Sequence, residues 1–163
     1  VRERNANRPA PDVDVWNRRG TYRVGLPLRH HIPAKLRIFR SERDSIHSVR
    51  CTDLSLGGAG IASADAFSAG DAVLITIALG IDRNLTLRGR IVHSRKADRR
   101  KLIFSGIEFL EMSEKEESEV RELWTVCQRI EVLCQRGVNQ QDIPAISDLM
   151  MPNPSTSDVN PPG

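Results

Sequence analysis

Two short segments of this chain hold side chains suited to binding an anion. The first contains Arg19 and Arg23, which are spaced as R-x-x-x-R and are preceded by Arg18. The second runs from residue 53 to residue 58 with the sequence DLSLGG, spaced as D-x-S-x-x-G. Arginine can meet a phosphate with two parallel hydrogen bonds, and it stays charged at any relevant pH. The first segment is therefore the expected contact for a negatively charged ligand.

The second segment offers complementary groups. Asp53 can accept a hydrogen bond from a ligand donor or hold an arginine in its rotamer, and both roles stay open. The hydroxyl of Ser55 can bond to a phosphate or ribose oxygen. Gly58 permits positive φ and lets backbone N–H groups approach a ligand. Each segment alone is a common pattern, because basic arms are usually solvated and an aspartate and serine before glycines often form a hairpin turn.

Taken together, the order and separation of the two segments resemble the signature of the PilZ domain, a bacterial receptor for the second messenger cyclic di-GMP. The resemblance covers roughly residues 17–136 and includes a closing G-x-x-F pattern from Gly106 to Phe109. It implies a six-stranded antiparallel β-barrel with a C-terminal helix. It also implies a ligand with two phosphates and two guanines, whose edges arginine can bind.

The resemblance assigns a ligand-binding role to six residues. They are Arg18, Arg19, Arg23, Asp53, Ser55 and Gly58. It implies that the R-x-x-x-R pair clamps guanine and phosphate while the D-x-S-x-x-G residues line the opposing face. An arginine in the place of Arg18 implies that a stacked pair of ligands binds. The arginine segment, expected to be mobile and little anchored over residues 13–28, would fold over the barrel when ligand binds.

Charge is distributed unevenly along the 163 residues. The first 50 residues hold twelve Lys and Arg against five Asp and Glu, whereas residues 102–163 hold four against eleven. This asymmetry suits an anion near the N-terminal segment. One alternative is a small basic β-barrel that binds a nucleic-acid polymer, which the 4% aromatic content disfavours because such proteins stack bases on exposed rings. The other is a PilZ-like scaffold for protein contacts that has lost its ligand.

Alternating or β-branched segments predict a mainly β chain with short turns between strands. The expected strands are residues 32–39, 46–54, 59–62, 73–79, 85–93 and 102–109. Six such strands favour an antiparallel barrel or sandwich over a fold with parallel strands.

A single long helix is predicted from Glu114 to Arg136. Ser113 and Glu116 form a capping-box pattern, and Gly137 stands where a helix usually ends. Apolar residues recur every three or four positions. This stripe is expected to pack on one open end of the barrel, with a homodimer seam as the alternative.

These patterns predict a non-enzymatic binding module. The three cysteines and four histidines show no metal-binding spacing, and no catalytic motif is present. No carboxylate or cysteine stands at ligand spacing from His47 or His93, so each histidine is expected to be a surface or barrel residue. No apolar run suggests a membrane span or signal peptide, so a cytoplasmic location is expected. We expect a linker or the end of an upstream segment over residues 1–16, the domain over 17–137, and a disordered tail over 138–163. The resemblance implies control of motility, exopolysaccharide production or a similar process through a protein partner.

Overall fold

The computed structural model describes residues 22–40, 42–97 and 101–150, and it shows a closed antiparallel barrel. The barrel strands follow the order β3-β2-β5-β6-β7-β4, and β4 pairs back onto β3. The strands are β1 (Val24–Gly25), β2 (Ile32–Ile38), β3 (Ser45–Ser55), β4 (Gly58–Ser63), β5 (Ala72–Gly80), β6 (Arg83–Lys96) and β7 (Ile103–Phe109). The prediction of a mainly β, six-stranded PilZ-like barrel is confirmed.

Side-chain alternation builds the barrel interior. Along β2 every second residue is buried and the others face outward, as the period of a strand requires. Large aliphatic residues fill the inside, among them Leu36, Ile75 and Ile107. The outward faces of the strands are therefore free to carry polar groups.

The short strand β1 precedes the first strand that the sequence predicted. It pairs with the last part of β3, so that Val24 lies opposite Leu54 and Gly25 opposite Asp53. Strand β2 pairs with β3 only as far as Cys51. After β1 the chain makes the 3₁₀ turn η1 (Leu28–His30) and then enters β2. Strand β1 therefore pairs with the part of β3 that extends beyond its pairing with β2.

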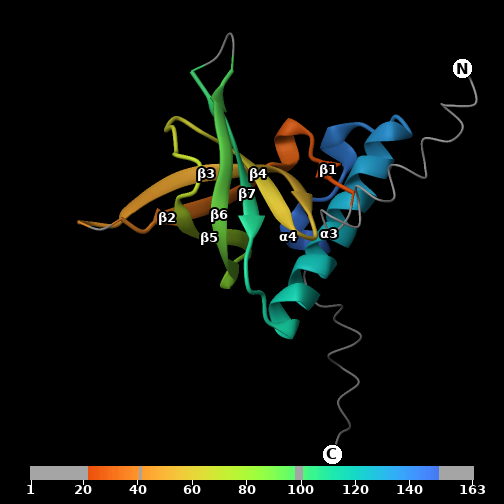
Figure 1. The fold of residues 1–163 in the computed structure, drawn as a ribbon. Coiled ribbons are helices and arrows are strands. Elements are labelled where there is room, and N and C mark those ends of the chain that lie inside the picture. Colours follow the sequence, from red (N-terminus) through yellow and green to blue (C-terminus); the bar gives the residue numbers. More distant parts are fainter. Residues whose placement is uncertain (1–21, 41, 98–100, 151–163) are drawn as a thin grey trace, which may run out of the picture.

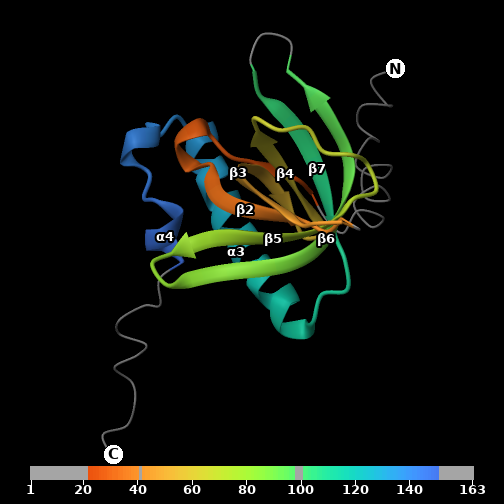
Figure 2. The same ribbon diagram turned by 90° about the vertical axis from the view of Figure 1, so that its left-hand side faces the viewer.

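Helix α3 (Glu114–Gln135) lies across one end of the barrel, with the short helix α4 (Ile146–Leu149) beside it (Figures 1 and 2). The predicted capping box is present, because the Glu116 N–H donates to Ser113 Oγ at 3.1 Å and the Ser113 N–H donates to Glu116 Oε1 at 2.9 Å. Gly137 follows the helix with φ of 86°. The apolar stripe packs into the barrel core as expected, and only its edge, which includes Trp124 and Leu133, stays partly exposed.

The segment after Gly137 differs from the predicted disordered tail. Residues 138–150 form the 3₁₀ turn η2 (Gln140–Asp142) and the short helix α4 (Ile146–Leu149). Ile143, Ile146 and Met150 are buried in the core cluster. Three apolar side chains therefore anchor a segment whose polar and proline-containing sequence suggested disorder. Residues 151–163 lie outside the described part of the chain.

Among the described residues, no helix combines the length and apolar character that crossing a membrane requires.

Candidate ligand-binding site

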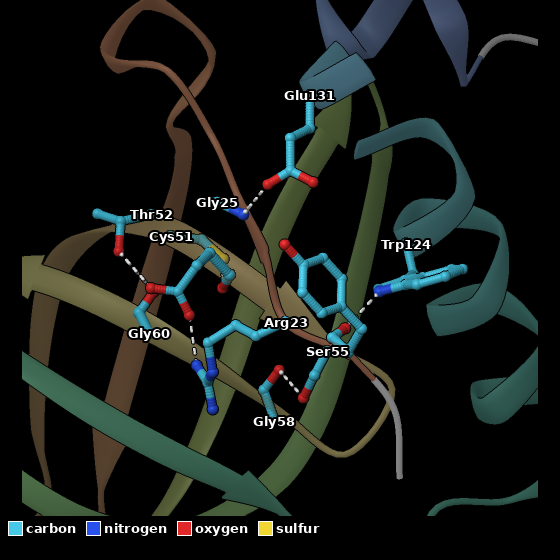
Figure 3. A network of polar contacts seen from close by, with 11 residues as sticks. Arg23, Gly25, Cys51, Thr52, Ser55, Gly58, Gly60, Trp124 and Glu131 are labelled. Carbon is cyan, nitrogen blue, oxygen red and sulfur yellow. Dashed lines mark hydrogen bonds and ion pairs between the residues drawn. The ribbon is translucent and has the colours of Figure 1, made fainter. Parts of the chain in front are cut away.

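The side chains of Arg23 and Asp53 form an ion pair on the outer face of the barrel. Arg23 immediately precedes β1, and the β1–β3 pairing brings it close to Asp53. Arg23 Nη1 donates to Asp53 Oδ1 (Figure 3). The Arg23 side chain is 47% exposed and that of Asp53 28% exposed. Two segments that lie thirty residues apart in sequence are thus joined at a surface that a ligand can reach.

Asp53 owes its position to an irregularity in β3. The strand register shifts between Cys51 and Asp53, so that Asp53 points outward. The hydroxyl of Thr52 donates to Asp53 Oδ2 at 3.2 Å. Gly60 lies opposite on β4, and a Cβ there would stand only 2.4 Å from Asp53 Oδ2. The carboxylate therefore rests over a glycine and is held by Arg23 and Thr52. Sequence spacing carried no signal for Thr52.

Ser55 and Gly58 close the hairpin between β3 and β4. Ser55 is buried, and its hydroxyl lies 3.4 Å from the Gly58 carbonyl oxygen. Gly58 does not adopt the positive φ that a glycine permits. A Cβ at Gly58 would instead stand 2.3 Å from the Ile107 carbonyl oxygen. Glycine is needed here because β4 and β7 approach closely.

The structure brings together four of the six expected site residues. Arg23 pairs with Asp53, and the β3–β4 register places Ser55 opposite Gly58 and Asp53 opposite Gly60 in the same hairpin (Figure 3). Arg18 and Arg19 lie outside the described residues, so their contribution stays a prediction.

Helix α3 holds the segment that carries Arg23. Trp124 Nε1 donates to the Tyr22 carbonyl oxygen at 3.0 Å, and the Gly25 N–H donates to Glu131 Oε2 at 3.1 Å (Figure 3). Val24, the next residue of this segment, is fully buried. The expectation that little anchors the arginine segment is therefore wrong for residues 22–28. The remainder, residues 13–21, lies outside the described range.

A groove of about 730 Å³ lies on the outer face of the barrel. Its lining includes Lys35, Arg50, Ala62 and Phe104, and Arg50 pairs with Ala62 across β3 and β4. No carboxylate lies among the lining residues, so the groove is electropositive. His31 also lines it. Burial lowers the pKa of His31 below 6.5, opposed by its hydrogen bond to the Leu26 carbonyl.

The described histidines and cysteines form no metal site. No group of three or more His, Cys, Asp or Glu in this part of the chain could hold a metal ion. His47 has a carboxylate partner that lies 18 residues away in the sequence. Its Nδ1 lies 2.8 Å from Asp65 Oδ2, because a turn after β4 returns Asp65 to the same surface.

Comparison with known proteins matches most of this chain to one protein family. Residues 17–125 match the family model of the PilZ domain. Among solved structures, the PilZ domain with c-di-GMP of YcgR from Escherichia coli has 20% identity and a TM-score of 0.55, covering 71% of this chain and 95% of that chain. YcgR in complex with c-di-GMP, also from Escherichia coli, has 19% identity and a TM-score of 0.54, covering 72% and 49%.

A third solved structure, the Bacillus subtilis inhibitor of motility (MotI/DgrA), has 14% identity and a TM-score of 0.50, covering 68% of this chain and 49% of that one. This chain therefore matches about half the length of two of these proteins. At such identities the likeness shows a shared fold. No curated protein matches this chain significantly.

Proposed function

Because this chain belongs to the PilZ domain family, we propose that it is a receptor for cyclic di-GMP that works by binding and not by catalysis. The ion pair of Arg23 and Asp53 on the outer face of the barrel carries this proposal. It joins the two halves of the family motif at one exposed position. Solved neighbours described as holding c-di-GMP support the same ligand.

The local chemistry suits a dianion with guanine bases. Asp53 engages one terminal nitrogen of Arg23, which leaves other N–H groups of the guanidinium to meet a phosphate or the guanine O6 and N7. The pair holds the arginine in place before ligand arrives, which lowers the entropy cost of binding. The electropositive groove with Lys35 and Arg50 adds attraction for phosphate.

Calorimetric titration tests the proposal with three ligands: cyclic di-GMP, a linear GMP dinucleotide and single-stranded DNA. We expect selective binding of cyclic di-GMP. Arg23→Ala removes a charge-assisted contact worth roughly 1.5–3 kcal/mol, so affinity should fall about ten- to a hundredfold. Arg37→Ala is the matched control, because Arg37 forms an outer-face pair with Asp44 at 2.7 Å on the same barrel.

Equal affinity of Arg23→Ala and the parent protein would refute the arginine assignment. Preferential binding of single-stranded DNA would favour the nucleic-acid alternative. Absence of binding to all three ligands would favour an interaction scaffold without ligand.

Two finer parts of the proposal concern stoichiometry and response. Arg18 would help to neutralise a stacked pair of ligands, so saturation should require two ligands per chain, and Arg18→Leu should reduce this to about one. Binding would also raise hydrogen-exchange protection in residues 13–21, because residues 22–28 are already held by β3 and α3. The changed surface would then act on a protein partner that controls motility, exopolysaccharide production or a similar process.

A further inference from the structure

A row of four residues crosses the outer face of the barrel at the height of Asp53. Asp53 on β3 pairs with Gly60 on β4, Gly60 pairs with Gly106 on β7, and Gly106 pairs with His93 on β6. The row thus places one polar residue at each end and two glycines between them.

Both polar residues face outward because of a β-bulge. On β3 the register shifts between Cys51 and Asp53, and on β6 it shifts between Ile91 and His93. Cys51 and Ile91 are buried in the barrel, so strict alternation would turn the residues two positions later inward as well. Each bulge adds one residue and reverses that alternation. Two independent irregularities therefore aim Asp53 and His93 at the same stretch of surface.

The glycines make room for both side chains. A Cβ at Gly60 would stand 2.4 Å from the Asp53 carboxylate, and a Cβ at Gly106 would stand 2.6 Å from His93 Nε2. Both polar side chains therefore lean over the glycine backbone from opposite sides. The result is a flat floor bounded by a carboxylate and an imidazole.

His93 differs from the other histidines in its contacts. His30, His31 and His47 each have a ring nitrogen within hydrogen-bond distance of a protein oxygen. Among the described residues, the ring nitrogens of His93 have no such partner, and the side chain is exposed. The adjacent outward pair, Arg90 and Glu108, is joined by its own ion pair at 2.6 Å.

We propose that His93 is a ligand-contacting residue, whose ring nitrogen hydrogen-bonds the nucleotide held over the Gly60–Gly106 floor. This inference rests on the proposed function, because the ligand enters from the side of Arg23 and Asp53. It extends the site across β4 and β7 to a residue outside the arginine and D-x-S-x-x-G segments. The ligand is then bound from both edges of the floor.

Calorimetry with cyclic di-GMP on the parent protein and four variants tests the inference, with thermal unfolding as a check on folding. We expect His93→Ala to weaken binding about tenfold, as expected for loss of one hydrogen bond to a charged ligand. His93→Gln should recover part of the loss because it keeps a polar N–H group, whereas His93→Phe should not. Val92→Thr is the matched control, because Val92 is the exposed extra residue of the same bulge and the change keeps its branching.

A second measurement reports the contact directly. In NMR spectra of imidazole nitrogens, cyclic di-GMP should shift the His93 signals and leave those of His47 unchanged. If the parent protein binds the ligand while His93→Ala or His93→Phe binds within twofold of it, or the His93 signals do not move, the inference is wrong and the proposed function stands. If the parent itself does not bind cyclic di-GMP, both fail.

Discussion

At Gly60 the space that a Cβ would fill is taken by the Asp53 carboxylate. Gly60→Ala should therefore displace the carboxylate, loosen its pairing with Arg23 and weaken cyclic di-GMP binding by about tenfold. Gly25→Ala is the matched control, because nothing lies within 4 Å of a Cβ there and the N–H that donates to Glu131 is kept. Calorimetry on the two variants makes the comparison. Similar affinities for both would show that the position of Asp53 does not matter for binding.

Residue spacing predicted part of the site and could not predict the rest. Arg23, Asp53 and Ser55 were expected because their types and separation follow a known motif, and the structure brings them together. His93 was passed over as an ordinary surface or barrel histidine. A bulge reverses the alternation of a strand, and nothing in the local sequence marks where the extra residue falls. Thr52 was missed for the same reason.

At the scale of elements, helix α3 and strand β1 act as one unit. Trp124 donates to the Tyr22 carbonyl and Glu131 accepts from the Gly25 N–H, so the helix holds the backbone on both sides of Arg23. Trp124→Phe keeps the aromatic packing and removes the donor. We expect a loss of roughly 0.5–1.5 kcal/mol, seen as a two- to tenfold weaker affinity for cyclic di-GMP.

The control for Trp124→Phe is Thr125→Val, one position along the helix. Thr125 bonds only within α3, to the Arg121 carbonyl. If both variants bind ligand as tightly as the parent, the helix does not position Arg23. If both weaken equally, the effect reflects helix stability.

His31 lies immediately before β2, and its imidazole should make the free energy of unfolding depend on pH. Burial lowers its pKa below 6.5 in the folded protein. Below about pH 6.5 the unfolded chain then takes up a proton that the folded chain resists, so the free energy of unfolding should fall as pH decreases from that value. Urea unfolding at several pH values measures this, and His31→Gln should flatten the slope. A slope unchanged in His31→Gln would assign the pH dependence elsewhere.

The fold elements were predictable where periodicity was long and uninterrupted. Strand β2 and helix α3 lie within one or two residues of their expected bounds, because alternation and a capping box leave little choice. Strand β1 has only two residues, too few for any period to be visible. It exists because β3 extends beyond β2 and offers an unpaired edge.

At the scale of the whole molecule, the reactivity of the cysteines measures how stably helix α3 covers the end of the barrel. Cys51 and Cys127 are buried, and burial raises the pKa of the Cys127 thiol to about 12. Cys134 is only half-buried. At about pH 8 a thiol reagent should label Cys134 first and the other two only after unfolding, since the thiolate is the reactive form. Rapid labelling of Cys127 in the native protein would show that α3 leaves the barrel readily.

Our final prediction concerns residues 138–150, which pack against the barrel after helix α3. Ile143, Ile146 and Met150 are buried against the core, and Arg83 Nη1 donates to the Met150 carbonyl at 2.6 Å. Each buried apolar side chain contributes about 1.5–3 kcal/mol as an upper estimate. A chain that ends at residue 137 should therefore lose several kcal/mol of unfolding free energy, whereas one that ends at residue 150 should keep nearly all of it.

Urea denaturation of the two shortened chains and the full chain measures this difference. Ile146→Ala in the full chain is the safeguard if the shorter chain does not fold, and it should cost about 2–5 kcal/mol, as expected for a buried isoleucine. Because α4 contacts β5 and α3, removal of residues 138–163 should also expose Cys127 to thiol reagents. If the chain ending at residue 137 is as stable as the one ending at residue 150, the burial of residues 143–150 contributes nothing to folding, and the domain ends with α3 as the sequence suggested.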